Sequence, residues 1–190
     1  MKIFTKLLAV CAFAGCASAA NAGIIALTAT ETGGNQDFNG TLGIEFTVNA
    51  GYTIEATGLG VYDAGGDGFG GNSFYVAIFT AAQNLGIQVF GSPDAWTPTA
   101  GYNIFDFTSL VGPFSLSAGD YVHAAQGFDS TNNLWNAGFG GSAPSINDGG
   151  GAISFTGSTY NATTGSFLFP NVVDGSPTPP AITPLHSSTT

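Results

Sequence analysis

The chain has 190 residues, of which 7% are charged and 13% aromatic, and 29 residues are glycine. So few charges together with so many aromatic residues argue against a disordered protein, which needs low hydrophobicity and high net charge. A formal net charge of -10 repels phosphate backbones and anionic lipid, which argues against nucleic-acid binding.

The first 22 residues have the features of a secretory signal peptide, so we expect a secreted, extracellular protein. Lys2 and Lys6 precede an apolar stretch that is too short to span a bilayer, and small residues follow it. We expect cleavage after Ala22, with cleavage after Ala19 or a lipoprotein modified at Cys16 as alternatives. The exported chain then has no disulfide, no Lys and no Arg, so divalent cations are the natural counter-ions of its acidic residues.

The rest of the chain reads as short strands separated by turns, with no helical period. The predicted strands cover residues 24–32, 41–49, 52–62, 73–80, 84–89, 102–108, 114–116, 121–128, 153–155 and 167–169.

Apolar residues alternate with polar ones over residues 41–49, which predicts a strand with one buried face. We expect this strand to form a hairpin with residues 52–62, and we expect a β-bulge at Gly58, where the apolar phase of the second strand changes. The strand over residues 73–80 is apolar on both faces, which predicts burial on both sides.

About ten such strands, with turn signals between them, predict an all-β fold: a β-sandwich, of jelly-roll type. We expect the sandwich to span residues 23–173. Residues 174–190 contain four of the nine prolines and are expected to form an extended linker or a disordered end.

Some of these segments resemble exported bacterial proteins of the PEP-CTERM-associated kind, over about residues 40–128. The similar segments are Phe46–Val48, Ile54–Asp63, Gly66–Phe69, Val76–Ile78 and Leu116–Val122. The resemblance implies an extracellular β-sandwich tied to the cell surface or biofilm matrix, with no established catalytic role. Such proteins usually end in a Pro-Glu-Pro motif, a transmembrane helix and a basic cluster. This sequence shows none of these, so we expect either a released protein without a transmembrane anchor or a likeness to the domain alone.

An acidic glycine-rich loop at residues 63–72 is similar to a calcium-binding loop. Asp63, Asp67 and Gly68 occupy positions 1, 5 and 6 of that pattern, but position 3 is Gly65 and position 12 is not Glu. Asn72 or a distant carboxylate could complete a Ca²⁺ site. The alternative is a flexible turn in which the aspartates only cap the backbone.

An enzyme is not expected. His123 lies in a predicted strand without a nucleophile motif nearby, which favours a half-exposed structural histidine. Glu45 and Glu55 could form a carboxylate pair on adjacent strands, but the exported chain would have no Lys or Arg to hold a charged substrate.

Two loop tryptophans, Trp96 and Trp135, either stack on sugar rings or plug the ends of the sandwich. The sequence therefore supports two functional hypotheses. The first is an extracellular structural or adhesive protein of a surface, matrix or filament, which self-associates. The second is a carbohydrate-binding module that holds an extracellular polysaccharide through these tryptophans.

Overall fold

A computed structural model describes residues 24–28, 38–63, 68–99, 102–106, 112–129, 145–174 and 185–189. Within these ranges the chain is almost entirely β-structure, with one short 3-10 helix, η1 (Pro93–Ala95). No helix in them is long and apolar enough to cross a membrane. The predicted signal peptide and its cleavage sites lie outside these ranges.

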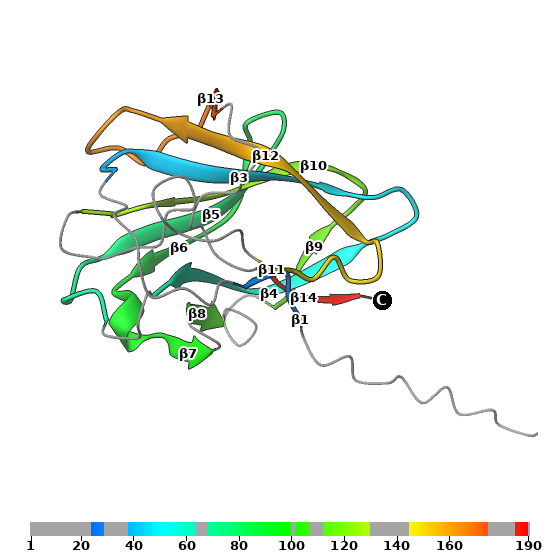
Figure 1. The fold of residues 1–190 in the computed structure, drawn as a ribbon, viewed down its shortest axis with the longest axis horizontal. Helices are drawn as coiled ribbons and strands as arrows, with labels where there is room; N and C mark the ends of the chain where they lie inside the picture. Colours follow the sequence, from blue (N-terminus) through cyan, green and yellow to red (C-terminus); the bar gives the residue numbers. More distant parts are fainter. Residues whose placement is uncertain are drawn as a thin grey trace, which may run out of the picture.

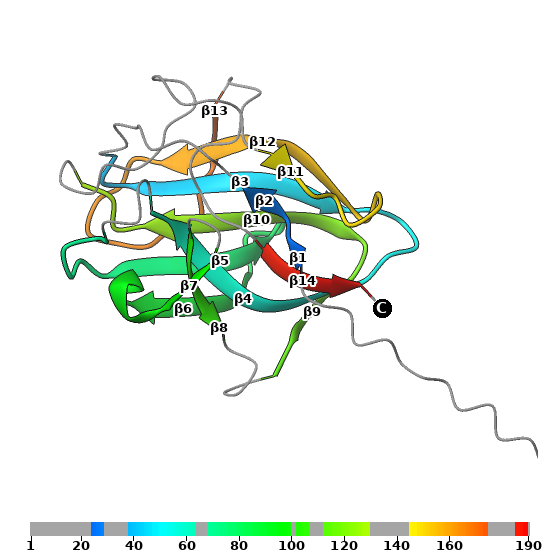
Figure 2. The same ribbon diagram turned by 60° about the horizontal axis from the view of Figure 1, so that its bottom comes forward.

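Two six-stranded sheets pack face to face and form two layers (Figures 1 and 2). The β3 sheet has the order β13 (Val172–Asp174), β12 (Ile153–Asn161), β3 (Thr41–Val48), β10 (Gly119–Gln126), β5 (Phe74–Thr80) and β6 (Leu85–Gly91). The β4 sheet has the order β1 (Ile24–Ile25), β14 (Leu185–Thr189), β4 (Ile54–Tyr62), β8 (Tyr102–Asp106) and β7 (Thr97–Thr99), and β9 (Phe114–Leu116) also pairs with β4.

Strands β2 (Leu27–Thr28) and β11 (Ser145–Ile146) form a separate small pair, and every strand pair in the described part of the chain is antiparallel. The predicted all-β sandwich is therefore confirmed, while its jelly-roll connectivity stays a prediction. The strand predicted over residues 24–32 is split into β1 and β2 by a bend at Ala26, which is fully buried.

The main core lies between the two sheets and follows from the alternation of apolar residues. Leu42, Ile44, Phe46 and Val48 of β3 are all buried in it, as predicted for one face of that strand. Their polar neighbours on β3 face the opposite side of the sheet. This second side of the β3 sheet, directed away from the β4 sheet, is called the outer face below.

A β-bulge lets β4 contribute both of its apolar phases to the same core. In the pairing with β14, His186 lies opposite Gly58 and Ser187 opposite Ala56, so Thr57 is the extra residue. The extra residue reverses the alternation. Ala56 before the bulge and Leu59 after it are both fully buried. The bulge predicted at Gly58 is therefore present, one residue earlier, at Thr57.

Strand β5 is buried on both sides, as predicted. Phe74, Val76 and Ile78 belong to the main core. Ala77 and Phe79 belong instead to a second apolar cluster on the outer face, together with Val122 and Ala124 of β10 and with Phe167 and Phe169.

The two phenylalanines come from the strap, defined as residues 162–171 between β12 and β13, which lies across the outer face. The prediction of a strand over residues 167–169 is wrong, because side chains rather than a ladder hold this segment. The Asn161 amide donates to the Phe169 carbonyl at 3.0 Å, and the Thr159 hydroxyl lies 2.9 Å from the Pro170 carbonyl oxygen. Gly43 makes room for the strap, since a Cβ there would lie 2.6 Å from Pro170 Cγ.

The predicted hairpin between residues 41–49 and 52–62 is also wrong. Strands β3 and β4 lie in different sheets, and the turn between them changes layer. The Asn49 side chain stabilises this corner by donating to the Gly151 carbonyl at 2.8 Å. Two strands that each have an apolar face bury more surface by covering one another than by lying side by side.

The C-terminal segment differs from the extended tail that was predicted for residues 174–190. Leu185–Thr189 forms β14, which pairs with β1 on one side and β4 on the other. All four prolines of this segment precede residue 185, so none of them removes an N–H group from the ladder.

Candidate functional site

Two carboxylates at the end of the sandwich organise the acidic loop. Asp63 follows β4, is 7% exposed, and accepts a hydrogen bond from the Gly68 N–H at 3.1 Å. Asp94 of η1 accepts two more, from the Phe69 N–H at 2.6 Å and from the Gly71 N–H at 2.8 Å. Gly68, like Gly71, has a positive φ, of 85°, and this curls the backbone so that its N–H groups converge on the anions.

Of the three predicted metal ligands, the structure describes Asp63 and Asn72. Asp67 lies outside the described residues, and the Asn72 amide donates to Asp129 at 3.0 Å. No group of three acidic, histidine or cysteine side chains in the described residues is placed to hold a metal ion. Calcium binding by Asp63, Asp67 and Asn72 therefore stays a prediction.

Sequence reasoning missed Asp94, the residue that holds this loop. Asp94 lies 23 residues from Gly71 along the chain, inside a segment that was predicted only as a long loop. A Ser-Pro-Asp sequence is typical of a turn, but nothing local indicates that the turn meets the glycines of another loop.

Trp96, one of the two tryptophans predicted to bind a ligand, is buried in the structure. Trp96 is 9% exposed and packs in the main core, next to Gly91, where a Cβ would lie 3.2 Å from the indole Nε1. A buried ring plugs the end of the sandwich and does not present a face for stacking on a sugar. Trp135 lies outside the described residues.

The residues considered for catalysis are not brought together. His123 is 3% exposed, not half-exposed as expected, and lies in register with Ile44 and Ile78 on its two neighbouring strands. Glu45 is on β3 and Glu55 on β4, so they lie in different sheets and do not form the pair that the expected hairpin would have made.

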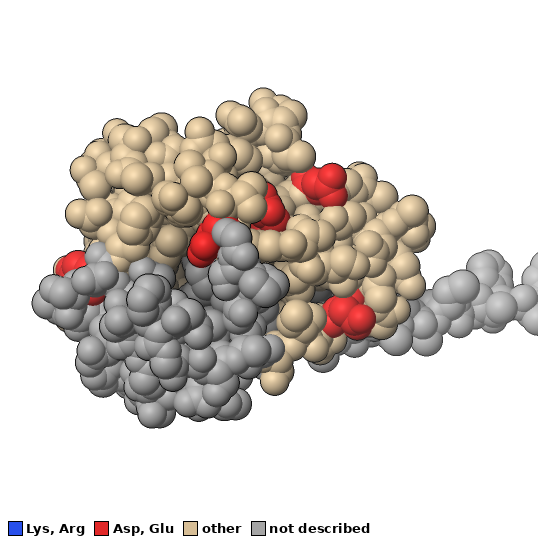
Figure 3. All heavy atoms as spheres, turned by 45° about the horizontal axis from the view of Figure 1, so that its top comes forward, with Lys and Arg blue, Asp and Glu red and all other residues tan. Residues whose placement is uncertain are grey.

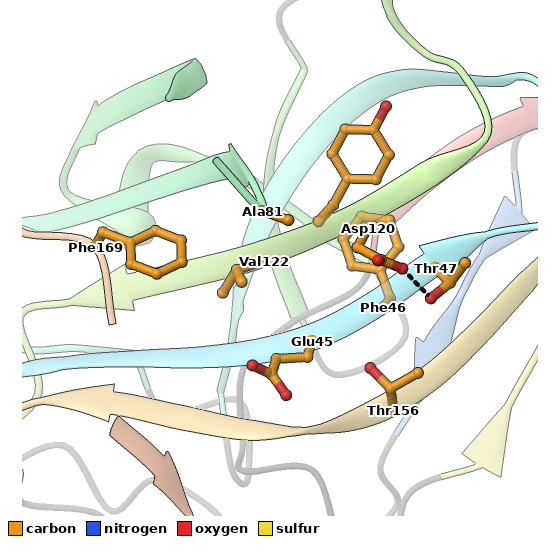
Figure 4. A pocket seen from close by; sticks show the side chains of 9 residues that line it. Glu45, Phe46, Thr47, Ala81, Asp120, Val122, Thr156 and Phe169 are labelled. Carbon is orange, nitrogen blue, oxygen red and sulfur yellow. Dashed lines mark hydrogen bonds between the residues drawn. The ribbon is translucent and has the colours of Figure 1, made fainter. Parts of the chain in front are cut away.

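A groove on the outer face is the strongest candidate for a binding site (Figure 4). We call it the outer groove; its volume is about 500 Å³, within the roughly 300–1,000 Å³ of typical small-molecule sites. It is lined by Glu45, Phe46, Thr47, Ala81, Asp120, Tyr121, Val122, Thr156 and Phe169.

Neighbouring strands supply the polar side of the outer groove. Asp120 of β10 lies opposite Thr47 of β3 in register, and the Thr47 hydroxyl donates to its carboxylate at 2.6 Å. Glu45, two residues before Thr47, lies on the same face of β3. Carboxylates accept several hydrogen bonds, so Asp120 retains acceptor capacity beyond its bond to Thr47.

A β-bulge in β12 shapes the third side of the outer groove. Phe155 lies opposite Phe46 and Gly157 opposite Glu45, so Thr156 is the extra residue, and it is exposed. A Cβ at Gly157 would lie 3.0 Å from Glu45 Oε2, which shows how closely the carboxylate approaches this strand. Bulges often re-aim a side chain next to functional sites.

Apolar groups line the rest of the outer groove. Val122 lies between the ring of Phe169 and the Thr47–Asp120 pair (Figure 4). Phe46 and Tyr121 also border the groove, but their rings lie on the inner side of the sheet, where the two residues are paired in register and stack with ring centroids 5.6 Å apart. The Tyr121 hydroxyl donates to the Ser117 carbonyl at 2.9 Å. Burial raises the pKa of Tyr121 above its ordinary value of 10.0, so this ring adds no charge at neutral pH.

The charge around the outer groove has one sign. Both lysines precede residue 7 and the chain has no arginine, so the described residues include neither. The face drawn in Figure 3 accordingly shows acidic side chains at several places and no basic ones among the coloured residues. The outer groove can accept hydrogen bonds and cover apolar surface, but it cannot pair with an anion.

No protein-family model matches this chain, and no curated protein or solved structure matches it either.

Proposed function

We propose that this protein is a secreted, extracellular adhesive protein that binds a neutral polysaccharide in the outer groove. The observation that carries the proposal is the lining of this groove, where carboxylate and hydroxyl groups lie beside apolar side chains in a chain that has no Lys or Arg after residue 6.

The lining matches the chemistry of a sugar. Sugar hydroxyls are hydrogen-bond donors, and Glu45 and Asp120 offer charged acceptors, which form stronger hydrogen bonds than neutral ones. The C–H face of a sugar ring is apolar and fits against the ring of Phe169, which is only partly buried. The bond from Thr47 holds Asp120 in place before a ligand arrives, which lowers the entropic cost of binding.

Electrostatics narrows the class of polysaccharide. A polyanion such as a uronic acid polymer would meet Glu45 and Asp120 without any cation to offset the repulsion. A neutral polymer meets no such penalty. This outer-face site also replaces Trp96 as the centre of a carbohydrate-binding hypothesis, because Trp96 is buried.

Affinity gel electrophoresis on neutral polysaccharides, such as a β-glucan, a xylan and a galactomannan, tests the proposal. Glu45→Gln and Asp120→Asn each remove a charged acceptor, and a hydrogen bond to a charged group contributes about 1.5–3 kcal/mol, so retention should fall about tenfold or more. The matched control is Glu55→Gln, which changes a carboxylate of the other sheet and should bind like the wild type.

Two alternatives to a neutral polysaccharide in the outer groove, a cationic polymer and a loop-aromatic site, would give different retention results. Binding to a neutral glycan should persist at about 1 M salt, where the Debye length is about 3 Å, whereas binding of a cationic polymer would be lost. Loss of retention in Trp135→Ala, with Glu45→Gln unaffected, would favour the loop-aromatic site instead. No retention on any neutral polysaccharide would overturn the proposal.

A further inference from the structure

The ends of the two sheets differ in how they are protected against pairing with another chain. β1 has 2 residues, β7 has 3 with Pro98 in the middle, and β13 has 3 and ends at Asp174. Short length, proline and charge are the usual devices that stop edge strands from associating.

Strand β6 at the fourth end has neither charge nor proline. It is 7 residues long, with the sequence LGIQVFG. Its pairing with β5 shifts register once, at Gly86, which leaves Ile87–Gly91 regular. Leu85 is 51% exposed and Phe90 56% exposed, so the strand is open to solvent.

An open edge of this kind has unused backbone groups. Successive residues of a strand point their N–H and C=O groups to alternate sides, so about half of the residues of β6 direct theirs away from β5. Water satisfies these groups in a single copy, and another strand would satisfy them equally well.

We propose that β6 pairs in an antiparallel manner with β6 of a second copy of this chain, so that the two β3 sheets become one continuous sheet. An antiparallel strand pair has a two-fold axis, and self-association through one patch requires that axis. No other strand of the β3 sheet offers an uncharged edge of this length.

The sequence of β6 complements itself about this axis. With Gln88 at the axis, Ile87 of each copy faces Val89 of the other, and both residues lie on the inner side of the sheet, in register with Ile78 and Val76 of β5. Aliphatic pairs opposite each other stabilise antiparallel strands. The two Gln88 side chains meet on the outer face, where an amide can both donate to and accept from its symmetry mate.

Charge opposes this pairing without preventing it. Each copy is strongly acidic, but β6 itself has no charged residue. At physiological ionic strength the Debye length is about 8 Å, so repulsion between the rest of the two molecules is screened. The dimer should therefore be weak at low salt and stronger at high salt.

The two-fold axis is perpendicular to the sheet, so both outer grooves face the same side. β10 and β3 lie two and three strands from β6 in the sheet order. At about 4.8 Å per strand, equivalent strands of the two grooves lie roughly 25–35 Å apart. One polysaccharide chain can then bind in both outer grooves of the dimer. This consequence rests on the proposed function, whereas the strand pairing does not.

Sedimentation velocity on the full chain, without glycan, tests the pairing. A strand pair of this size buries less than a standard interface, so we expect dimers to form between about 10 µM and 1 mM. Gln88→Glu places two like charges at the axis and should raise the dissociation constant about tenfold or more. Thr164→Glu adds the same charge at an exposed strap position and should leave dimerisation unchanged.

A cross-link gives a second, independent readout. Residues that face each other across antiparallel strands have Cα atoms about 4.5–5.5 Å apart, within the range for a disulfide. Gln88→Cys should therefore form a covalent dimer on mild oxidation, while Thr164→Cys should not, with the wild type as background for Cys11 and Cys16. A monomer at about 1 mM and high salt, or dimers that Gln88→Glu leaves intact, would overturn the pairing.

Discussion

Replacing Asp94 with alanine should lower the free energy of unfolding by about 2 kcal/mol. The carboxylate of Asp94 accepts N–H groups from Phe69 at 2.6 Å and Gly71 at 2.8 Å. Hydrogen bonds to charged groups contribute about 1.5–3 kcal/mol each. Asp94 is exposed, so water can replace part of the lost hydrogen bonding. The loss of unfolding free energy is therefore smaller than the sum of the contributions of the two bonds.

The two N–H groups are not equally easy to hydrate. Phe69 is only 1% exposed and packs on Phe74 with ring centroids 5.1 Å apart. Its N–H must either stay without a partner or move the ring to reach water. We therefore expect the Phe69 bond to account for most of the 2 kcal/mol estimated above.

Urea unfolding followed by tryptophan fluorescence measures this change, with chelator present so that bound calcium does not contribute. Trp96 lies two residues from Asp94 and is buried, so it reports on this end of the sandwich. Asp94→Asn keeps one acceptor oxygen, which can stay on the Phe69 N–H, and should therefore lose less than half as much. The melting temperature of Asp94→Ala should fall by about 4–8 °C.

Asp174→Ala is the matched control, since it removes an exposed aspartate from a short edge strand. It should change the free energy of unfolding by no more than about 0.5 kcal/mol. If Asp94→Ala were as stable as this control, the two hydrogen bonds would not hold the loop, and the role assigned to Asp94 would be refuted.

Three further predictions concern the core, pH and calcium. Phe79→Ala should cost about 3 kcal/mol, because the ring is 6% exposed and packs on Phe167 and Phe169; Phe90→Ala, at an exposed site, should cost less than about 1 kcal/mol in the same urea assay. Because burial raises the pKa of Tyr121 above 10.0, its contribution to stability is present below pH 10 and is lost as the pH rises through the raised value. Tyr121→Phe should therefore lose less stability than the wild type in alkaline urea titrations, and equal slopes would contradict this. A calcium site in the acidic loop should raise the melting temperature by several degrees at about 5 mM calcium, and chelator or Asp63→Asn should remove that rise; a melting temperature indifferent to calcium would leave the loop as a turn held by Asp94.

Local periodicity predicted the features that depend on one strand at a time. Three such features are confirmed: the alternation in β3, the two-sided burial of β5 and the phase change next to Gly58. Each depends only on residues that are close together in the sequence. The predicted hairpin failed because alternation shows only that a strand has an apolar face. It does not show whether the next strand pairs with this strand in the same sheet or packs over its apolar face from the other sheet.

The outer groove could not be predicted because its parts come from distant segments. Glu45, Asp120 and Thr156 are separated by dozens of residues along the chain and meet only through the order β12–β3–β10. Thr156 faces the groove because a bulge in β12 displaces it. The apolar phase does change between Phe155 and Tyr160, but this change does not show which strand lies beside the bulge. Glu45 was placed on the polar side of β3, but the identity of its neighbours depended on which strands pair.

The pairing of β1 with β14 places the first and last described strands in the sheet that does not carry the outer groove. Ile24 and Ser187 are partners in register, so the first and last described strands lie side by side in the β4 sheet, in the layer opposite to β3, β10 and β12 (Figure 1). A tether at either end would emerge from the same layer. A chain held in this way on a support would turn its outer groove outward, toward whatever passes over the surface.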